Sequence, residues 1–215
     1  MESNKKFYNE DKYKELHDWI REFWKITYEC KLCYLYCIRL YGAKNQDEAD
    51  YLNSSKFFKN TAHIYWRNLV IEVAKLFIPR DAHHYNIQNL IKYFENKPEY
   101  KQVGLSSVVL KQWADFLEEK KETINVVWGL RDRFYSHTDK PNKKEEVDYS
   151  NILIDDLKPL IDMAEGVIKE VYHVAFDSDT DFFVDYKDRD FDFLTVLSND
   201  RLNKINYWKQ KLEGQ

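Results

Sequence analysis

The chain has 215 residues, of which 44% are hydrophobic and 16% aromatic, so it is long enough to bury one sizeable core. It contains only five glycines and four prolines, whereas an all-β domain would need turn residues far more often. The formal net charge is −4, so any contact with nucleic acid has to come from a local basic patch.

The N-terminal half has apolar residues at steps of three and four, which predicts two long amphipathic helices. The first covers about 13–41, and Gly42 follows it as a helix-terminating glycine. The polar stretch 43–54 has room for a short helix. The second long helix is expected over 55–78 and ends at Pro79, because proline cannot continue it.

The same periodicity continues beyond this proline. A short helix over 87–95 is expected to be closed by Pro98. A long helix follows, capped by Ser106 or Ser107, and is expected to run as far as His137.

Two further helices are expected in the C-terminal third. One covers about 151–176, with its start nearer Leu157 because Pro159 falls inside the pattern. A stretch with seven aspartates, 177–192, then precedes a last amphipathic segment over 193–212.

Four or five long helices with short polar connections predict an all-α protein: a helical bundle with a C-terminal helical extension. We expect the bundle to occupy 1–176, and the acidic loop and last helix of 177–215 to pack on it. Residues 1–14 lack an apolar signal region, and no stretch approaches the roughly 18 apolar residues of a membrane span. The expected location is the cytoplasm, without membrane contact.

The three cysteines, Cys30, Cys33 and Cys37, lie at positions i, i+3 and i+7 of the first long helix. Their odd count and the lack of a second cluster argue against a disulfide framework and against a zinc site. The aspartate-rich run that begins at Asp177 has Phe182 where a calcium loop has glycine. We therefore expect buried thiols on one helix face, and neither a metal nor another cofactor.

The residues with the most chemical content lie in 131–144, which holds five basic and two acidic side chains. This local positive charge suits a phosphate-bearing partner. The basic residues are Arg131, Arg133, Lys140, Lys143 and Lys144, and the acidic residues are Asp132 and Asp139.

RNA cleavage without a metal needs a base for the 2′-OH proton, an acid for the leaving 5′-oxygen and a cation for the phosphorane. Histidine serves either proton transfer near neutral pH, and arginine stabilises the negative charge. His137 and Arg131 supply these two groups. Because two histidines serve both transfers more easily than one, we expect a symmetric dimer that unites both copies of the segment.

Helix geometry brings these side chains only partly together. Arg133 and His137 share a face at i and i+4, whereas Arg131 lies about 120° away around a straight helix. Arg131 reaches the same site only if the helix end unwinds or the partner chain closes the gap. The pattern is also compatible with a solvated helix end, where cations favour the helix dipole.

At these residues the chain resembles the HEPN superfamily, whose motif is Arg, four to six residues, then His, with a polar residue after the Arg. Arg131, Asp132 and His137 match this motif. The form Arg-Asp-Arg-Phe-Tyr-Ser-His-Thr-Asp is most similar to the Arg-Asn-Lys-x-x-Ala-His-x-Asp pattern of the abortive-infection U-type branch. In that pattern Asp139 is the trailing aspartate, which orients the histidine or caps the turn, and Arg133 takes a phosphate-binding Lys or Arg position.

The resemblance implies a helical homodimer with a composite cleft and metal-independent endoribonuclease activity, used in phage defence or as the toxin of a toxin–antitoxin pair. An antitoxin protein would then be a further partner beside the RNA substrate. Other expected RNA contacts are Lys140, Lys143, Lys144 and, if the second long helix lines the cleft, Arg67 and Asn68. The alternative interpretation is a non-catalytic helical dimer that binds a nucleotide, RNA or a partner protein.

Overall fold

A computed structural model of the chain describes residues 10–78, 84–132, 152–180 and 191–213. The predicted all-α class is confirmed, because these described residues form helices and no strand. The elements, in chain order, are α1 (Glu10–Tyr41), α2 (Gln46–Ser54), α3 (Lys56–Phe77), α4 (Ile87–Asn96), α5 (Pro98–Lys101), α6 (Ser107–Glu119), α7 (Lys121–Leu130), the 3-10 helix η3 (Ile154–Leu157), α8 (Lys158–Phe176) and α9 (Asp192–Glu213).

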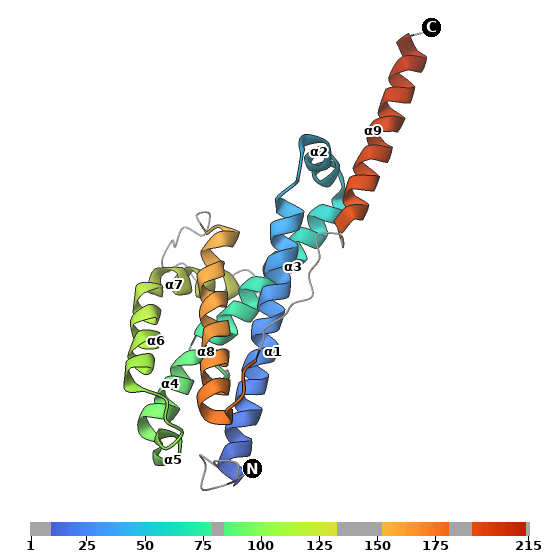
Figure 1. Cartoon of the computed structure of the whole chain (residues 1–215). Coiled ribbons are helices and arrows are strands. Elements are labelled where there is room, and N and C mark those ends of the chain that lie inside the picture. Colours follow the sequence, from blue (N-terminus) through green and yellow to red (C-terminus); the bar gives the residue numbers. More distant parts are fainter. Residues whose placement is uncertain (1–9, 79–83, 133–151, 181–190, 214–215) are drawn as a thin grey trace.

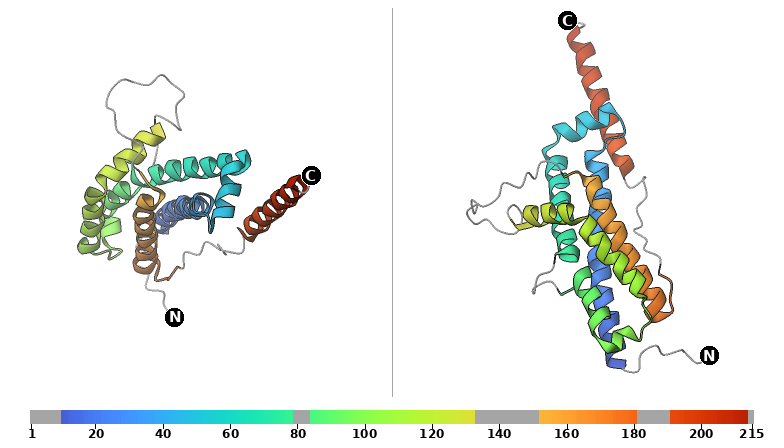
Figure 2. Two further views of the ribbon diagram at one scale, coloured as in Figure 1. Left: turned by 90° about the horizontal axis from the view of Figure 1, so that it is seen from above. Right: turned by 90° about the vertical axis from the view of Figure 1, so that its left-hand side faces the viewer.

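The longest helix, α1, runs along the bundle, and α3 returns beside it (Figure 1). α8 also packs on α1, while α7 packs on α3 and α6 packs on α4. Steps of three and four give α1 one buried apolar face, which forms the centre of the core. Seen from above in Figure 2, α9 lies to one side, away from α6 and α7.

The long helix predicted from Ser107 to His137 is wrong as a single element, because α6 and α7 meet at Lys120 (φ −92°, ψ 10°). Six polar residues, 118–123, separate the apolar positions of the two helices. The break lets α6 lie on α4 and α7 lie on α3, which one straight rod does not allow. The predicted cap is confirmed: the Ser106 hydroxyl accepts from two backbone N–H groups of the first turn of α6.

Two prolines lie at helix starts. The predicted short helix is confirmed as α4, which ends at Asn96 just before Pro98. Pro98 also opens α5, where its missing N–H costs nothing. Pro159 stands in the first turn of α8, so the expected start near Leu157 is confirmed. η3 leads into that turn, and the Asp156 carboxylate accepts from the backbone N–H of Leu153 at 2.7 Å.

The turn between α1 and α2 is tight. The backbone N–H of Gly42 donates to the carbonyl of Ile38 at 2.8 Å, which closes α1. A Cβ at position 42 would lie 2.6 Å from that carbonyl oxygen, so a side chain does not fit there. Asn45 then caps α2 by accepting from the backbone N–H of Glu48 at 2.9 Å. The predicted short helix is therefore confirmed.

A buried ion pair joins α1 to α2 beyond this turn. Arg39 and Glu48 are 5% and 0% exposed at their side chains, and their charged groups are in direct contact. The guanidinium also donates to the Gly42 carbonyl at 3.4 Å and lies 5.6 Å from the ring centre of Phe191. A second, smaller apolar cluster surrounds the pair and includes Leu194 at the start of α9.

α9 touches the rest of the chain mainly through its first turns. It packs on α2, and among its residues only Leu194 and Ser198 are buried. The later turns extend beyond the bundle (Figure 1). The division into 1–176 and 177–215 stays a prediction.

The three cysteines are buried in the core and form no disulfide, as expected from their spacing. Burial raises the pKa of Cys33 and of Cys37 to about 12, and that of Cys30 well above its usual range. All three thiols are therefore neutral near physiological pH, which removes the thiolate that alkylation or zinc binding needs.

We predict that Arg39→Ala destabilises the chain by about 3–5 kcal/mol, because it leaves the Glu48 carboxylate buried without its cation. The free energy of unfolding, measured in urea, checks this. Lys111→Ala serves as the control, since the pair of Lys111 with Asp115 is 74% and 65% exposed and should contribute little. An equal decrease in the free energy of unfolding in the two variants would show that burial does not strengthen the Arg39–Glu48 pair.

We also predict that iodoacetamide at about pH 8 leaves the native protein unmodified. Raised thiol pKa values and burial both suppress reaction. In guanidinium chloride all three cysteines should react, as counted by intact mass. Rapid labelling of the native chain would contradict the packing of α1.

Candidate active site

The structure describes two residues of the predicted motif, Arg131 and Asp132, directly after α7. It also describes Arg67 and Asn68, which are exposed on α3. The remaining predicted site residues lie outside the described residues: Arg133, His137, Asp139, Lys140, Lys143 and Lys144.

The apolar face of α7 fixes the position of the motif. Ile124, Val127 and Leu130 are buried in the main core, and α7 packs on α3. Arg131 keeps helical backbone angles (φ −58°, ψ −51°), and its N–H points back to the carbonyls of Val127 and Trp128. The motif arginine therefore starts from a rigid helix end and not from a loop.

The Arg131 side chain is only 13% exposed. Its guanidinium lies 3.4 Å from one carboxylate oxygen of Asp132, and the indole N–H of Trp128 donates to the other oxygen at 2.9 Å. The carboxylate thus connects the two side chains and restricts the orientation of the guanidinium. Because the group is largely shielded from water, its charge acts more strongly on a nearby anion than a fully solvated arginine would.

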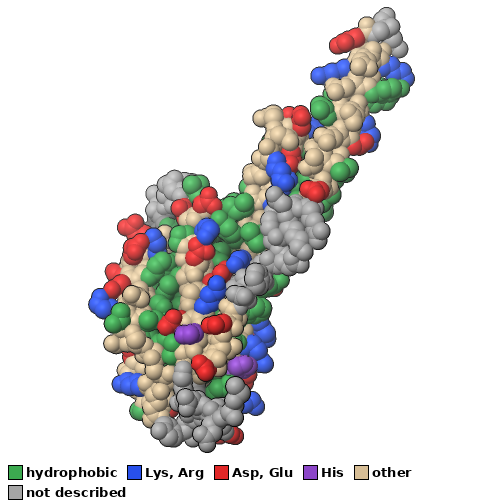
Figure 3. Space-filling view, viewed as in Figure 1, with side chains coloured by type: hydrophobic (Ala, Val, Ile, Leu, Met, Phe, Trp, Pro, Cys, Tyr) green, Lys and Arg blue, Asp and Glu red, His purple; other side chains and the backbone are tan. Residues whose placement is uncertain are grey.

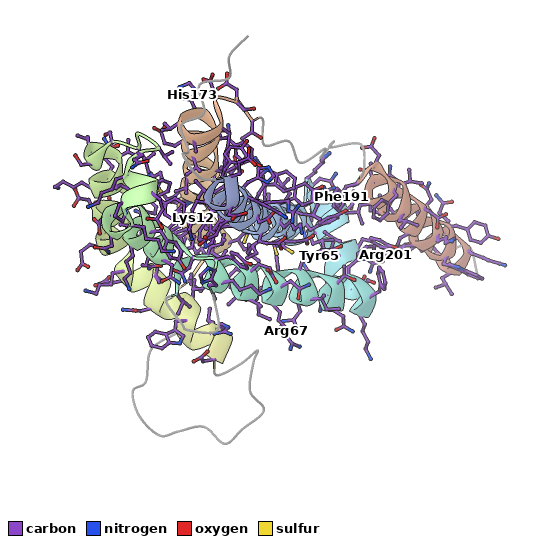
Figure 4. All side chains as sticks on the ribbon, turned by 90° about the horizontal axis from the view of Figure 1, so that it is seen from below. Lys12, Tyr65, Arg67, His173, Phe191 and Arg201 are labelled. Atoms are coloured by element: carbon purple, nitrogen blue, oxygen red, sulfur yellow. The ribbon has the colours of Figure 1, made fainter. Side chains whose placement is uncertain are left out.

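α3 offers a polar surface beside α7. His63 and Arg67 are one helical turn apart, and both are exposed, as is Asn68. Figure 4 shows Arg67 pointing away from α1, on the side of the bundle where α7 ends. Arg67 therefore places a cationic side chain on the helix that α7 contacts.

Sequence reasoning missed the role of Trp128. The ring is 44% exposed, and its N–H donates to the Asp132 carboxylate at 2.9 Å. The i, i+4 spacing of Trp128 and Asp132 is the signal that would have found the contact.

The chain that follows the motif is anchored to α1. The hydroxyl of Tyr34 donates to the Asp155 carboxylate in η3 at 3.0 Å, and burial together with this contact raises the pKa of Tyr34 to about 12. Lys31 on α1 pairs with Glu165 on α8 at 2.6 Å. Both ends of the motif segment, α7 and η3, are thus held on the same α1–α3 scaffold.

Among the described residues, no group of three or more His, Cys, Asp or Glu side chains could hold a metal ion.

The start of the aspartate-rich run terminates α8. Asp177 adopts a left-handed conformation (φ 51°) that closes α8, and the Asp179 carboxylate lies 3.2 Å from the His173 ring. None of the described helices combines the length and apolar character needed to cross a bilayer.

Comparison with known proteins supports the resemblance of the motif. A family model of HEPN domains described as AbiU2 matches residues 7–204, which is most of the chain and includes α1 to α8 and more than half of α9. No curated protein and no solved structure matches the chain. The arginine at the end of α7, the helical bundle that holds it and this match agree, and the chain belongs to the AbiU2 family of HEPN domains.

Proposed function

We propose that the protein is a metal-independent endoribonuclease that acts in abortive infection, either directly in phage defence or as the toxin of a toxin–antitoxin pair. The family membership supports a role in abortive infection. The observation that carries the chemistry is the largely shielded Arg131 guanidinium, oriented by Asp132 at the end of a rigid helix.

The reaction is attack by a 2′-hydroxyl on the adjacent phosphorus. His137 takes the hydroxyl proton in one copy of the chain, and the oxygen forms a bond to phosphorus as the bond to the 5′-oxygen breaks. His137 of the second copy gives a proton to that leaving oxygen. The products are a 2′,3′-cyclic phosphate and a free 5′-hydroxyl, so protons and bonds balance without water or metal.

Arg131 acts on the charge that develops during this attack. Negative charge grows on the equatorial oxygens of the phosphorane, and a planar guanidinium can donate to two of them at once. Asp132 already restricts the conformations of the Arg131 side chain before RNA binds. Less conformational entropy is therefore lost when the guanidinium binds the phosphorane. Asp132 is therefore a positioning residue.

Basic side chains beside the motif would bind the RNA backbone. Arg67 and Asn68 stand exposed on α3, which α7 contacts. Arg133, Lys140, Lys143 and Lys144 add positive charge in the segment that follows, and Asp139 is proposed to orient His137.

The decisive experiment incubates the purified protein with end-labelled RNA in EDTA. We predict cleavage to products with 2′,3′-cyclic phosphate ends, and complete loss of cleavage in His137→Ala with unchanged far-UV helix content. His173→Ala is the matched control. His173 is exposed on α8, and Figure 4 places it on the opposite side of the bundle from Arg67, so cleavage should be unaffected.

Two outcomes would reject the proposal. Cleavage that survives His137→Ala in EDTA would point to a contaminating nuclease or to other residues. Salt-sensitive RNA binding by the wild-type protein, with no product, would favour the alternative of a non-catalytic helical dimer.

We further predict that Asp132→Ala slows cleavage about tenfold, the effect of losing one hydrogen bond to a charged group. Asp132→Asn should stay within about threefold of wild type, because its single amide oxygen can still accept from the Arg131 guanidinium when the amide turns that oxygen toward it, at the expense of the Trp128 contact. Single-turnover rates at saturating RNA report the difference, while the RNA dissociation constant should hardly change. Equal rates in the two variants would argue against orientation by this contact.

A further inference from the structure

The outer half of α9 is a positively charged surface on an acidic chain. Residues 192–200 hold two acidic side chains and no basic one, whereas 201–213 hold four basic side chains and one acidic. The whole chain has a net charge of −4, so this positive charge is local. Figure 3 shows Lys and Arg side chains interspersed with apolar ones on the outer half of α9. Such a patch attracts anions that the chain as a whole repels.

This half of α9 borders a groove of about 560 Å³, here called the α9 groove. Of the described residues that line it, three are basic, one is acidic and two are aromatic: Arg201, Lys204, Lys209, Asp200, Trp208 and Tyr51. Tyr51 forms the wall on α2, and the rest of the lining belongs to α9 and is otherwise aliphatic. The surplus of basic side chains indicates an anionic occupant, and the aromatic and aliphatic walls indicate one that also has apolar faces.

The three basic side chains lie along one side of α9. Positions 201, 204 and 209 span about 12 Å of helix, which exceeds the spacing of successive phosphates in a nucleic acid strand. Figure 4 shows Arg201 on the side of α9 that faces the bundle. Lys204 pairs with Asp200 at 2.6 Å, but both groups are more than half exposed, so a phosphate can replace the carboxylate at little cost.

Exposed aromatic rings accompany these cations. Tyr207 and Trp208 are 58% and 56% exposed, and the Nζ atom of Lys211 lies 5.9 Å and 5.3 Å from their ring centres. The bases of a single strand stack on such rings while neighbouring cations bind its phosphates. An acidic peptide supplies the negative charge without a base in every unit, and a duplex keeps its bases stacked inside. The combination therefore favours single-stranded nucleic acid.

The acidic side chains beside the α9 groove define its other edge. Asp47 and Asp50 are exposed on α2, and Asp50 accepts from the Gln46 side chain at 2.8 Å. A polyanion is therefore expected to follow α9 and to meet α2 at the Tyr51 ring.

We propose that the α9 groove binds single-stranded RNA, with phosphates on Arg201, Lys204 and Lys209 and a base stacked on Trp208. The choice of RNA as the strand rests on the proposed ribonuclease function, whose substrate it is. α9 lies away from α6 and α7, so this surface is separate from the end of α7 that carries Arg131 (Figure 2). A long RNA can contact both surfaces at once, whereas a short one occupies either of them, so affinity should rise with RNA length.

Fluorescence anisotropy with a labelled 2′-O-methyl oligouridylate of about 20 nucleotides, longer than a typical single binding site, tests the proposal. Lys204→Gln combined with Lys209→Gln should weaken binding about tenfold and reduce the slope of log K against log salt by about 1.4, or about 0.7 for each lost phosphate contact. Arg21→Gln combined with Lys25→Gln is the matched control. It removes the same charge from exposed positions on α1 and should keep the wild-type affinity within about twofold.

Two substitutions separate stacking and local charge from bulk charge. Trp208→Ala should weaken binding about tenfold, and Trp208→Phe should stay within about threefold of wild type because it keeps a ring. Asp200→Asn should tighten binding about threefold, because it removes a carboxylate of the lining and its pairing with Lys204. Circular dichroism checks that the helix content of every variant is retained.

Equal affinities in the Lys204/Lys209 variant and the Arg21/Lys25 control would overturn the proposal. So would poly-glutamate that competes as well as RNA for both the wild type and Trp208→Ala, which would assign the α9 groove to acidic polypeptides. The methylated strand lacks the attacking 2′-hydroxyl and cannot be cleaved. Binding to the groove therefore stays measurable if the chain has no nuclease activity, and cleavage of unmodified RNA stays measurable if the groove does not bind.

Discussion

The packing of α1 against α3 is the contact on which the other elements depend. It is the most extensive helix pair of the described structure, and α8, η3 and α7 are all placed by one of these two helices. α1 has 32 residues and is about 48 Å long, so a single core cannot cover it from end to end. The main core covers most of it, and the smaller cluster around Leu40 covers the far end, where α2 and α9 meet it.

The sequence predicted the helices well because each has a strong local signal. Apolar steps of three and four, Ser106 as a cap and Pro159 in a first turn act within a few residues. The break at Lys120 was missed because the polar run around it consists largely of good helix formers, so nothing local ends the helix. The break follows from α6 and α7 packing on different helices. The Arg39–Glu48 pair was missed for a similar reason, since only the folded turn buries both charges.

The candidate site was predictable to a different degree at each residue. Arg131 and Asp132 were predicted from a short motif, and the structure adds that the arginine is shielded and lies against the Asp132 carboxylate. That shielding depends on α7 packing on α3, which is a long-range contact that no nearby residue indicates. Trp128 looked like one more core residue because apolar spacing alone does not reveal which aromatic rings stay partly outside. The placement of His137 still rests on the motif, because it lies outside the described residues.

The absence of a side chain at Gly42 constrains how this protein can diverge. The carbonyl of Ile38 belongs to the last turn of α1, so it cannot move aside without opening that turn. A larger residue would therefore require a shift in the turn that leads to α2, the helix that carries Glu48. A substitution at this glycine would therefore be tolerated best together with a change in the length of the turn, or with replacement of the charged pair by apolar residues. Gly42, a turn residue without a side chain, thereby restricts which combinations of mutations the fold can accept.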